Sequence, residues 1–164
     1  MTPLTIICVD DEPEVLDALL RDLAEFEDTF HIDVASSAAE ARELIDGLAG
    51  QKRELALILC DHIMPGKNGV DLLIDLHEEP RHRAAQKVLV TGQAGLEDTV
   101  EAVNKANLRH FIAKPWKQAD LVHNVQQVLT DYVIENARDL LPYMRVLDTE
   151  RLMRATLARN PGDA

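Results

Sequence analysis

The chain has 164 residues, of which 46% are hydrophobic and 28% charged; these values suit one globular domain with a short appendage and exclude a wholly disordered chain. Asp and Glu number 29 against 17 Lys and Arg, a net charge of −12. Such a chain repels a phosphate backbone, so we expect no direct binding to nucleic acid. It has no apolar run of about 18 residues and no basic signal-peptide start, so we expect a cytoplasmic protein without a membrane segment.

Short apolar runs alternate with amphipathic stretches along the first two-thirds of the chain. The apolar runs predict strands at residues 4–9, 31–35, 55–60, 87–91 and 109–113. Helical spacing predicts helices at residues 13–26, 69–79, 96–106 and 117–133, with one more from an N-cap at Ser36 or Ser37 to residues 47–50. Near-continuous Val, Ile and Leu strands are typical of a parallel sheet covered on both faces, so the expected fold class is α/β, doubly wound. Cys8 and Cys60 lie in predicted strands, and we expect buried, reduced thiols.

Polar side chains follow or end four of the predicted strands. Asp10 and Asp11 follow the first, Asp61 the third, Thr91 ends the fourth, and Lys114 follows the fifth. Ligands of such sheets bind outside the carboxyl ends of the strands, so we expect these side chains to meet at one edge. The chain contains neither G-x-G-x-x-G after the first strand nor G-x-x-x-x-G-K-[ST], so a dinucleotide site and a P-loop are not predicted.

The expected cluster of carboxylates indicates a particular chemistry. Clustered carboxylates raise one another's pKa unless a cation neutralises them. Hard oxygen ligands with room for water suit Mg²⁺, which binds through a few carboxylates and phosphate oxygens. A carboxylate beside Mg²⁺ can attack phosphorus to form an aspartyl phosphate, while a lysine and a hydroxyl bind the phosphoryl oxygens. The residue types therefore predict Mg²⁺-dependent phosphoryl chemistry on an aspartate.

These motifs resemble the receiver domain of two-component response regulators over residues 4–117 and the helix to about residue 133. The resemblance is carried by Asp10-Asp11, by Asp61 within DHIMPGKNG, by Thr91-Gly92 and by Lys114-Pro115, all in order on the expected strands. It implies a flavodoxin-like sheet with strand order 2-1-3-4-5. It also implies a signalling switch that accepts a phosphoryl group from a histidine kinase or phosphotransfer partner.

The resemblance implies a role for each residue of the phosphoryl site. Asp61 is similar to the phosphoacceptor. Asp11 matches the direct Mg²⁺ ligand, and Asp10 the ligand that acts through water. The backbone carbonyl of Ile63 matches a further metal ligand, and Lys114 the lysine that pairs with the phosphoryl group.

The resemblance also implies switch residues. Thr91 matches the hydroxyl that moves toward the phosphoryl group, and Phe111 falls where the family keeps a switch aromatic. Simple core packing of Phe111 is an equally good interpretation. Pro115 follows the lysine, where the family commonly has a cis peptide bond. Ile63 and Gln93 match the positions that flank the path of attacking water, and we expect the branched Ile63 to slow hydrolysis of the phosphorylated state.

The C-terminal third continues the fifth helix. Apolar residues recur at helical spacing along it: Val122, Val125, Leu129, Val133, Ala137, Leu140, Met144 and Leu147. We predict a receiver core at residues 1–120, an extended fifth helix at 118–141 stopped by Pro142, and a helical appendage with a frayed tail at 142–164. Asp148 or Thr149 would cap the short helix at residues 150–159. The stripe either packs back on its own domain or forms an inter-subunit seam, and its length favours a homodimer.

The function that these features favour is a switch controlling protein–protein contacts, with no enzymatic activity beyond its own phosphorylation and dephosphorylation. One alternative is the receiver portion of a larger regulator whose effector domain lies outside this sequence. Another is a Mg²⁺-dependent phosphohydrolase. That class commonly has a second Asp two residues after the nucleophile, where this chain has Ile63.

Overall fold

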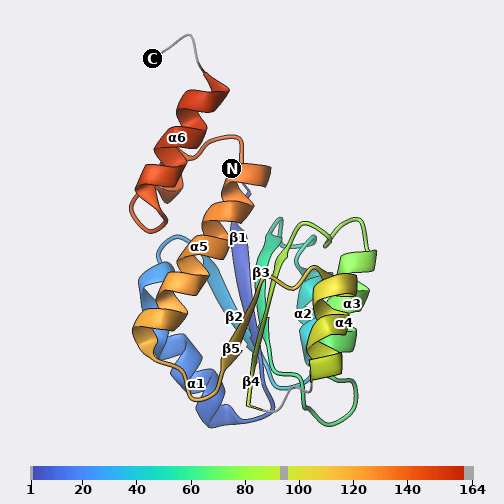
Figure 1. The fold of residues 1–164 in the computed structure, drawn as a ribbon. Coiled ribbons are helices and arrows are strands. Elements are labelled where there is room, and N and C mark those ends of the chain that lie inside the picture. Colours follow the sequence, from blue (N-terminus) through green and yellow to red (C-terminus); the bar gives the residue numbers. More distant parts are fainter. Residues whose placement is uncertain (1, 93–95, 161–164) are drawn as a thin grey trace.

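The predicted strands pair into one parallel sheet in the computed structural model, which describes residues 2–92 and 96–160. The strands within these residues are β1 (Leu4–Val9), β2 (His31–Ala35), β3 (Glu54–Cys60), β4 (Gln86–Thr91) and β5 (His110–Ala113). Their order across the sheet is β2-β1-β3-β4-β5, and each neighbouring pair is parallel. The doubly wound α/β fold and its strand order are therefore confirmed (Figure 1).

Helices cover both faces of this sheet. They are α1 (Pro13–Asp22), α2 (Ala38–Gly47), α3 (Gly69–Glu78), α4 (Leu96–Ala106), α5 (Gln118–Asn136) and α6 (Thr149–Arg159), with 3-10 turns at Ala24–Phe26 and Leu141–Tyr143. Helices α1 and α5 lie on one face, and α2, α3 and α4 on the other (Figure 1). Each face has its own apolar core, because side chains alternate between the two sides of a strand. Cys8 and Cys60 are buried free thiols, one in each core, as predicted.

Two of the predicted helices begin at a side-chain cap. Ser37 caps α2 by accepting a hydrogen bond from a backbone N–H three residues later, and Asn68 caps α3 in the same way. The first helix was predicted to reach residue 26 and instead ends at Asp22. A tighter 3-10 turn follows it and places both Leu23 and Phe26 in the core, fully buried.

The prediction that the fifth helix extends to residue 141 is wrong. Helix α5 ends at Asn136, and Ala137 is already extended. The guanidinium of Arg159 donates hydrogen bonds to the carbonyl oxygens of Ala137 at 3.0 Å and of Ile134 within the last turn of α5. The arginine, 22 residues away from Ala137, thus supplies hydrogen-bond partners to carbonyl oxygens that the end of the helix leaves open.

The chain after α5 folds back onto its own domain. Leu140, Tyr143 and Leu147 are buried in the same core as α1 and α5. The Tyr143 ring stacks on that of Phe30, with centroids 5.8 Å apart. Much of the predicted apolar stripe therefore packs within the molecule, which is the first of the two interpretations given for it.

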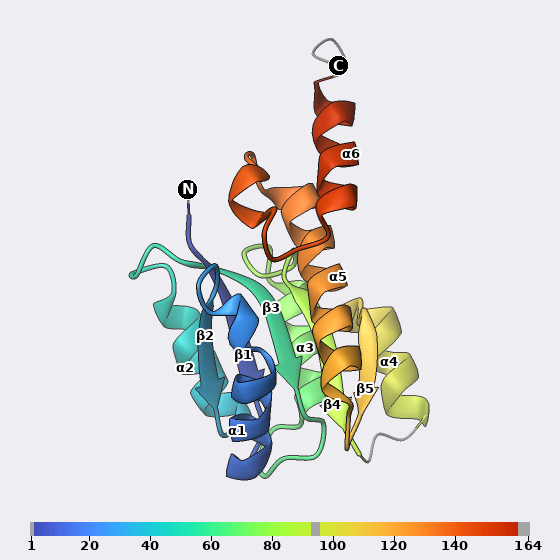
Figure 2. The ribbon, with the colours of Figure 1, turned by 90° about the vertical axis from the view of Figure 1, so that its left-hand side faces the viewer.

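Helix α6 stands beyond the end of the sheet beside α5 (Figures 1 and 2). Asp148 caps it by accepting a hydrogen bond from the Arg151 backbone N–H at 3.1 Å, as predicted. Asp131 of α5 accepts hydrogen bonds from Arg151 of α6 and, at 2.6 Å, from Arg109 beside β5. Across residues 2–92 and 96–160, none of the helices combines the length and apolar content that crossing a bilayer requires.

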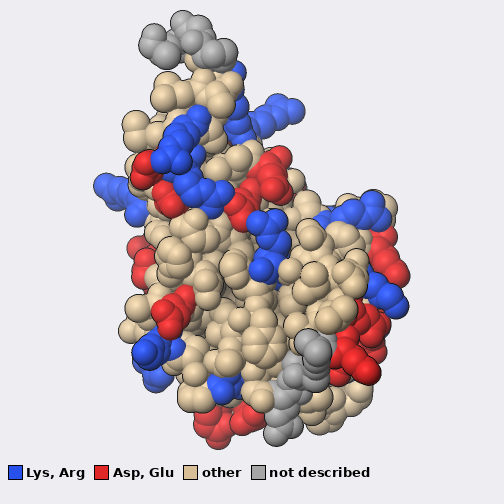
Figure 3. Space-filling model, viewed as in Figure 1, with Lys and Arg blue, Asp and Glu red and all other residues tan. Residues whose placement is uncertain are grey.

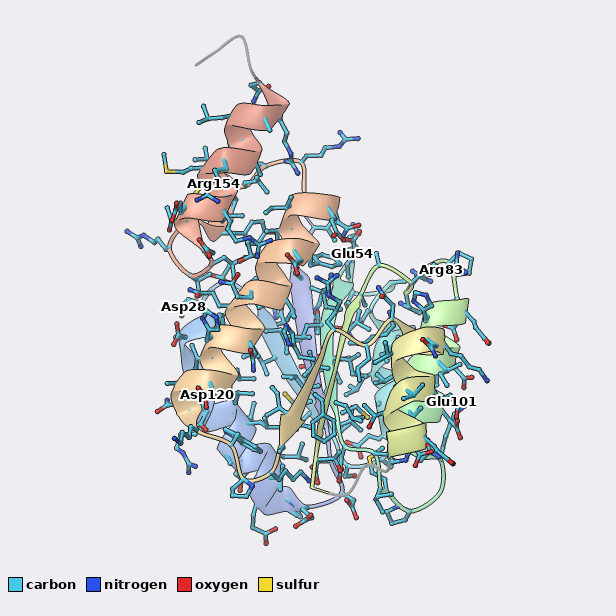
Figure 4. The ribbon with its side chains drawn as sticks, in the orientation of Figure 1. Asp28, Glu54, Arg83, Glu101, Asp120 and Arg154 are labelled. Atoms are coloured by element: carbon cyan, nitrogen blue, oxygen red, sulfur yellow. The ribbon has the colours of Figure 1, made fainter. Side chains whose placement is uncertain are left out.

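A lysine is buried at the amino end of β4. The side chain of Lys87 is 1% exposed, and its ammonium donates hydrogen bonds to the carbonyl oxygens of Ala85 at 2.7 Å and Arg83 at 3.1 Å. Arg83 and Glu54 lie at the end of the sheet opposite to the carboxyl ends of the strands (Figure 4). Burial, with a smaller contribution from the charge of Arg83, lowers the pKa of Lys87 to about 8.

Because of this burial, the free energy of unfolding is expected to rise with pH in the alkaline range. The unfolded lysine keeps its proton up to a pKa of about 10.4, so between pH 8 and 10 the unfolded state binds more protons and stability rises with pH. We expect the free energy of unfolding of the wild type, minus that of Lys87→Met, to increase by about 1 kcal/mol between pH 7 and pH 9. Urea denaturation at both pH values measures it. An unchanged difference would mean that Lys87 titrates normally in the folded state.

Candidate functional site

Three charged side chains meet at the carboxyl edge of the sheet. Asp10 directly follows β1, Asp61 follows β3, and Lys114 follows β5. The backbone N–H of Asp10 donates to Ala35 of β2 at 3.1 Å, and that of Asp61 to Val9 of β1 at 2.9 Å. The sheet pairing thus continues through both aspartates and fixes where their carboxylates lie.

The ammonium of Lys114 bridges the two aspartates. Its Nζ lies 2.6 Å from Asp10 Oδ2, 3.2 Å from Asp61 Oδ2 and 3.8 Å from Glu12 Oε1. Burial acts to lower the pKa of Lys114, but the hydrogen bonds and charges of Asp10 and Asp61 outweigh it and raise that pKa. Burial raises the pKa of Asp10, although Lys114 and the backbone N–H of Glu12 stabilise its charged form. The lysine therefore stays charged and holds the two carboxylates together.

The loop after β3 encloses Asp61 tightly. Its Oδ1 accepts a hydrogen bond from the His62 backbone N–H at 2.8 Å, and the residue is 5% exposed. Gly69 begins α3 against this loop, and a Cβ there would lie 1.8 Å from the Asp61 carbonyl oxygen. Only glycine permits this approach, so Gly69 shapes the loop that orients the phosphoacceptor candidate.

Four carboxylates around this point form a set of oxygen ligands. Asp10, Asp11, Glu12 and Asp61 each offer a carboxylate oxygen, and these atoms all lie within 4.8 Å of one another. Asp11 and Glu12 are exposed, whereas Asp10 and Asp61 are buried. One lysine cannot balance four such groups, and an all-oxygen donor set of this kind fits a hard divalent cation such as Mg²⁺.

The expected switch residues lie on the two neighbouring strands. Thr91 ends β4 and is buried, and its carbonyl oxygen accepts a hydrogen bond from the Lys114 backbone N–H at 3.3 Å. Phe111 on β5 is 42% exposed, so it is not a core residue. The Lys114–Pro115 peptide bond is cis, as the resemblance implied. The Ile63 side chain is 53% exposed, and Gln93 lies outside the described residues.

Sequence reasoning missed two further residues beside the site. His62 directly follows Asp61 and is buried, with ring contacts to α3 and α4. Trp116 follows the cis proline and donates from its indole to Asp22 of α1 at 2.8 Å. The place of His62 directly after the most apolar strand was a usable signal, whereas nothing in the sequence indicates that Trp116 pairs with an acid 94 positions earlier.

A doubly wound sheet with an acidic pocket and a lysine at its carboxyl edge defines a CheY-like receiver fold. A family model described as "Response regulator receiver domain" matches residues 6–126. The chain therefore belongs to the response regulator receiver domain family.

Individual proteins agree with this assignment. The chain is 31% identical to the hydrogenase transcriptional regulatory protein HoxA of Cupriavidus necator, over 95% of this chain and 32% of that protein. A CheY-like receiver domain protein from Methanospirillum hungatei has a TM-score of 0.70 at 29% identity, over 82% of this chain and 99% of that one. The receiver domain of an HD domain-containing protein from Pseudomonas fluorescens has a TM-score of 0.73 at 23% identity, over 85% and 96% respectively, and shows the fold. The chain spans between 25% and 52% of the length of the first regulators it matches.

Proposed function

We propose that the chain is a phosphorylation-controlled switch whose Asp61 accepts a phosphoryl group from a phosphohistidine of a kinase or phosphotransfer partner. The observation that carries this proposal is the position of Lys114, whose ammonium binds Asp10 and Asp61 together beside two further carboxylates. A structural ion pair needs one acid per base. The surplus of acids at this edge serves a cation and an incoming anionic group instead.

The transfer is an in-line displacement at phosphorus. A carboxylate oxygen of Asp61 forms the new P–O bond while the P–N bond to the donor imidazole breaks, and its electron pair returns to that ring nitrogen. Lys114 stays within reach of the phosphoryl oxygens as a charged donor. The buried Thr91 at the end of β4 would supply a hydroxyl to the same group.

The residues that would hold Mg²⁺ are Asp10, Asp11, Asp61 and the backbone carbonyl of Ile63. When bound, the ion supplies positive charge that offsets the carboxylates and the phosphoryl oxygens. The exposed Asp11 would be the direct ligand, and the buried Asp10, which hydrogen-bonds Lys114, would act through water.

The test is phosphorylation of the whole chain by acetyl phosphate with Mg²⁺, followed by intact mass spectrometry. We expect one phosphoryl group on the wild type, none on Asp61→Asn, and none after chelation of the metal. Asp17→Asn is the matched control, because Asp17 is an exposed acid of α1. Phosphorylation of Asp61→Asn to the wild-type level would exclude Asp61 as the acceptor.

Ile63 is proposed to slow loss of the phosphoryl group. Its exposed, branched side chain lies two residues after Asp61, where it would hinder an attacking water. We expect Ile63→Asn to shorten the half-life of the phosphorylated state about tenfold, because a polar group orders water and lowers the barrier by roughly 1.4 kcal/mol. Decay is followed by mass spectrometry after the donor is removed. An unchanged half-life would show that Ile63 does not control hydrolysis.

The output surface is proposed to include α4 and β5. Val100 and Val103 of α4 and Phe111 of β5 are large apolar side chains that are about half exposed. Exposed apolar groups of this kind mark a surface for another protein. Since the relatives are longer transcriptional regulators, this partner could equally be an effector domain of the same polypeptide. A phosphohydrolase is disfavoured, because the exposed Ile63 replaces the acid that would protonate a leaving group.

A homodimer through the C-terminal helices remains part of the proposal, although much of the apolar stripe is used within the molecule. Leu141, Met153 and Leu157 are the exposed large apolar side chains of this region. With Mg²⁺ and beryllofluoride, a phosphoryl mimic, we expect light scattering to show a shift from monomer to dimer. The shift should be lost in Met153→Gln/Leu157→Gln and kept in Val103→Gln. A monomer under all conditions would mean that the output is binding of a different protein.

A further inference from the structure

The ring of His62 joins the phosphoacceptor loop to helix α4. His62 is 3% exposed, and its Nε2 lies 3.1 Å from Asp98 Oδ2 in the first turn of α4. Its Nδ1 lies 3.4 Å from the backbone nitrogen of Val70 in α3. The ring therefore sits between two helices, one residue after Asp61.

The geometry assigns the roles of the two ring nitrogens. A backbone N–H can only donate, so Nδ1 must offer its lone pair to Val70. The proton of the neutral ring is then on Nε2, from where it donates to the carboxylate of Asp98. Both nitrogens then have a hydrogen-bond partner, and the bond to Asp98 is strengthened by the charge of its acceptor.

The same residue touches Asp61 and α4 with different atoms. The backbone N–H of His62 donates to Asp61 Oδ1 at 2.8 Å, while its side chain holds Asp98. A phosphoryl group on Asp61 changes the charge and geometry of the carboxylate that this N–H binds. Any shift of the His62 backbone then moves the ring on which α4 is held.

Helix α4 is a suitable element to be held in this way. Among its described side chains, the buried ones are two alanines, Ala102 and Ala106. Alanines bury little apolar area, so the charge-assisted hydrogen bond between Asp98 and His62 adds to what positions the helix. Its outer face carries the exposed Val100 and Val103 of the proposed output surface.

We infer that His62 is a positioning residue that couples the state of Asp61 to α4 through its hydrogen bond to Asp98. This inference rests on the proposed function of Asp61 and deepens it. It assigns to one side chain the link between the phosphoryl site and the output surface.

Hydrogen exchange of the α4 amides tests the link in the full chain, with and without Mg²⁺ and beryllofluoride. In the absence of beryllofluoride we expect Asp98→Ala to speed exchange about tenfold, because the helix loses its tether and opens more often. Asp98→Asn keeps an acceptor and should fall between Asp98→Ala and the wild type. Glu97→Ala is the matched control, since Glu97 is the neighbouring exposed acid in the same helical turn, and it should change exchange less than twofold.

The coupling itself has a second readout. Phosphorylation of Asp98→Ala by acetyl phosphate should stay within twofold of the wild type, because Asp98 is outside the acidic pocket. Its α4 amides should nevertheless lose most of the change that beryllofluoride causes in the wild type. His62→Gln, whose amide can still donate to Asp98, should retain more of this change than His62→Phe.

Each outcome bears on a separate claim. Equal exchange in Asp98→Ala and Glu97→Ala would overturn the tether. Faster exchange with a full beryllofluoride response would overturn the coupling, and leave His62 a structural residue only. If the wild type accepts neither acetyl phosphate nor beryllofluoride, the proposed function of Asp61 fails. The comparison without beryllofluoride would still decide whether the tether exists.

Discussion

The site depends on one partly buried cation, the ammonium of Lys114. Lys114 comes from the edge strand β5, and its long side chain reaches past β4 to Asp10 and Asp61, at the ends of β1 and β3. Two buried carboxylates this close would be costly to fold without it, because each would lose hydration and repel the other. The ammonium of Lys114 offsets the repulsion between these two carboxylates, but the net charge at this edge of the sheet stays negative. That remaining charge is the physical basis of the proposal that this edge takes up a divalent cation and then a phosphoryl group.

The strand order brings side chains that lie far apart in the sequence into this one cluster. Parallel strands need crossover helices, so consecutive carboxyl ends fall at one edge, tens of residues apart in the chain. For this reason the residues at the ends of the apolar runs predict that Asp10, Asp61, Thr91 and Lys114 lie at one edge of the sheet. The fold and the main acidic pocket were predictable because they follow from strand periodicity and from single positions next to it.

Contacts between side chains distant in sequence were not predictable in this way. At the end of α5, Arg159 donates to carbonyl oxygens about two dozen residues earlier, whereas the apolar periodicity alone continues smoothly to residue 147. The hydrogen-bond partners of the His62 ring were not predictable for the same reason. Its position directly after an apolar strand indicates burial, but the sequence does not indicate that α3 and α4 supply a donor and an acceptor to its two nitrogens.

Polar contacts join the helices at the rim of the molecule, in addition to its two apolar cores. Asp98 anchors α4 to His62, and Asp131 joins Arg109 beside β5 to Arg151 of α6. Residues 138–159 carry five arginines and three acids in an otherwise acidic chain, and blue side chains surround α6 in Figure 3. Exposed ion pairs of this kind each contribute little to stability, so exchanging their partners costs little free energy. Under the proposed function, a change of charge at Asp61 would act by shifting such contacts, while the sheet and both cores stay as they are.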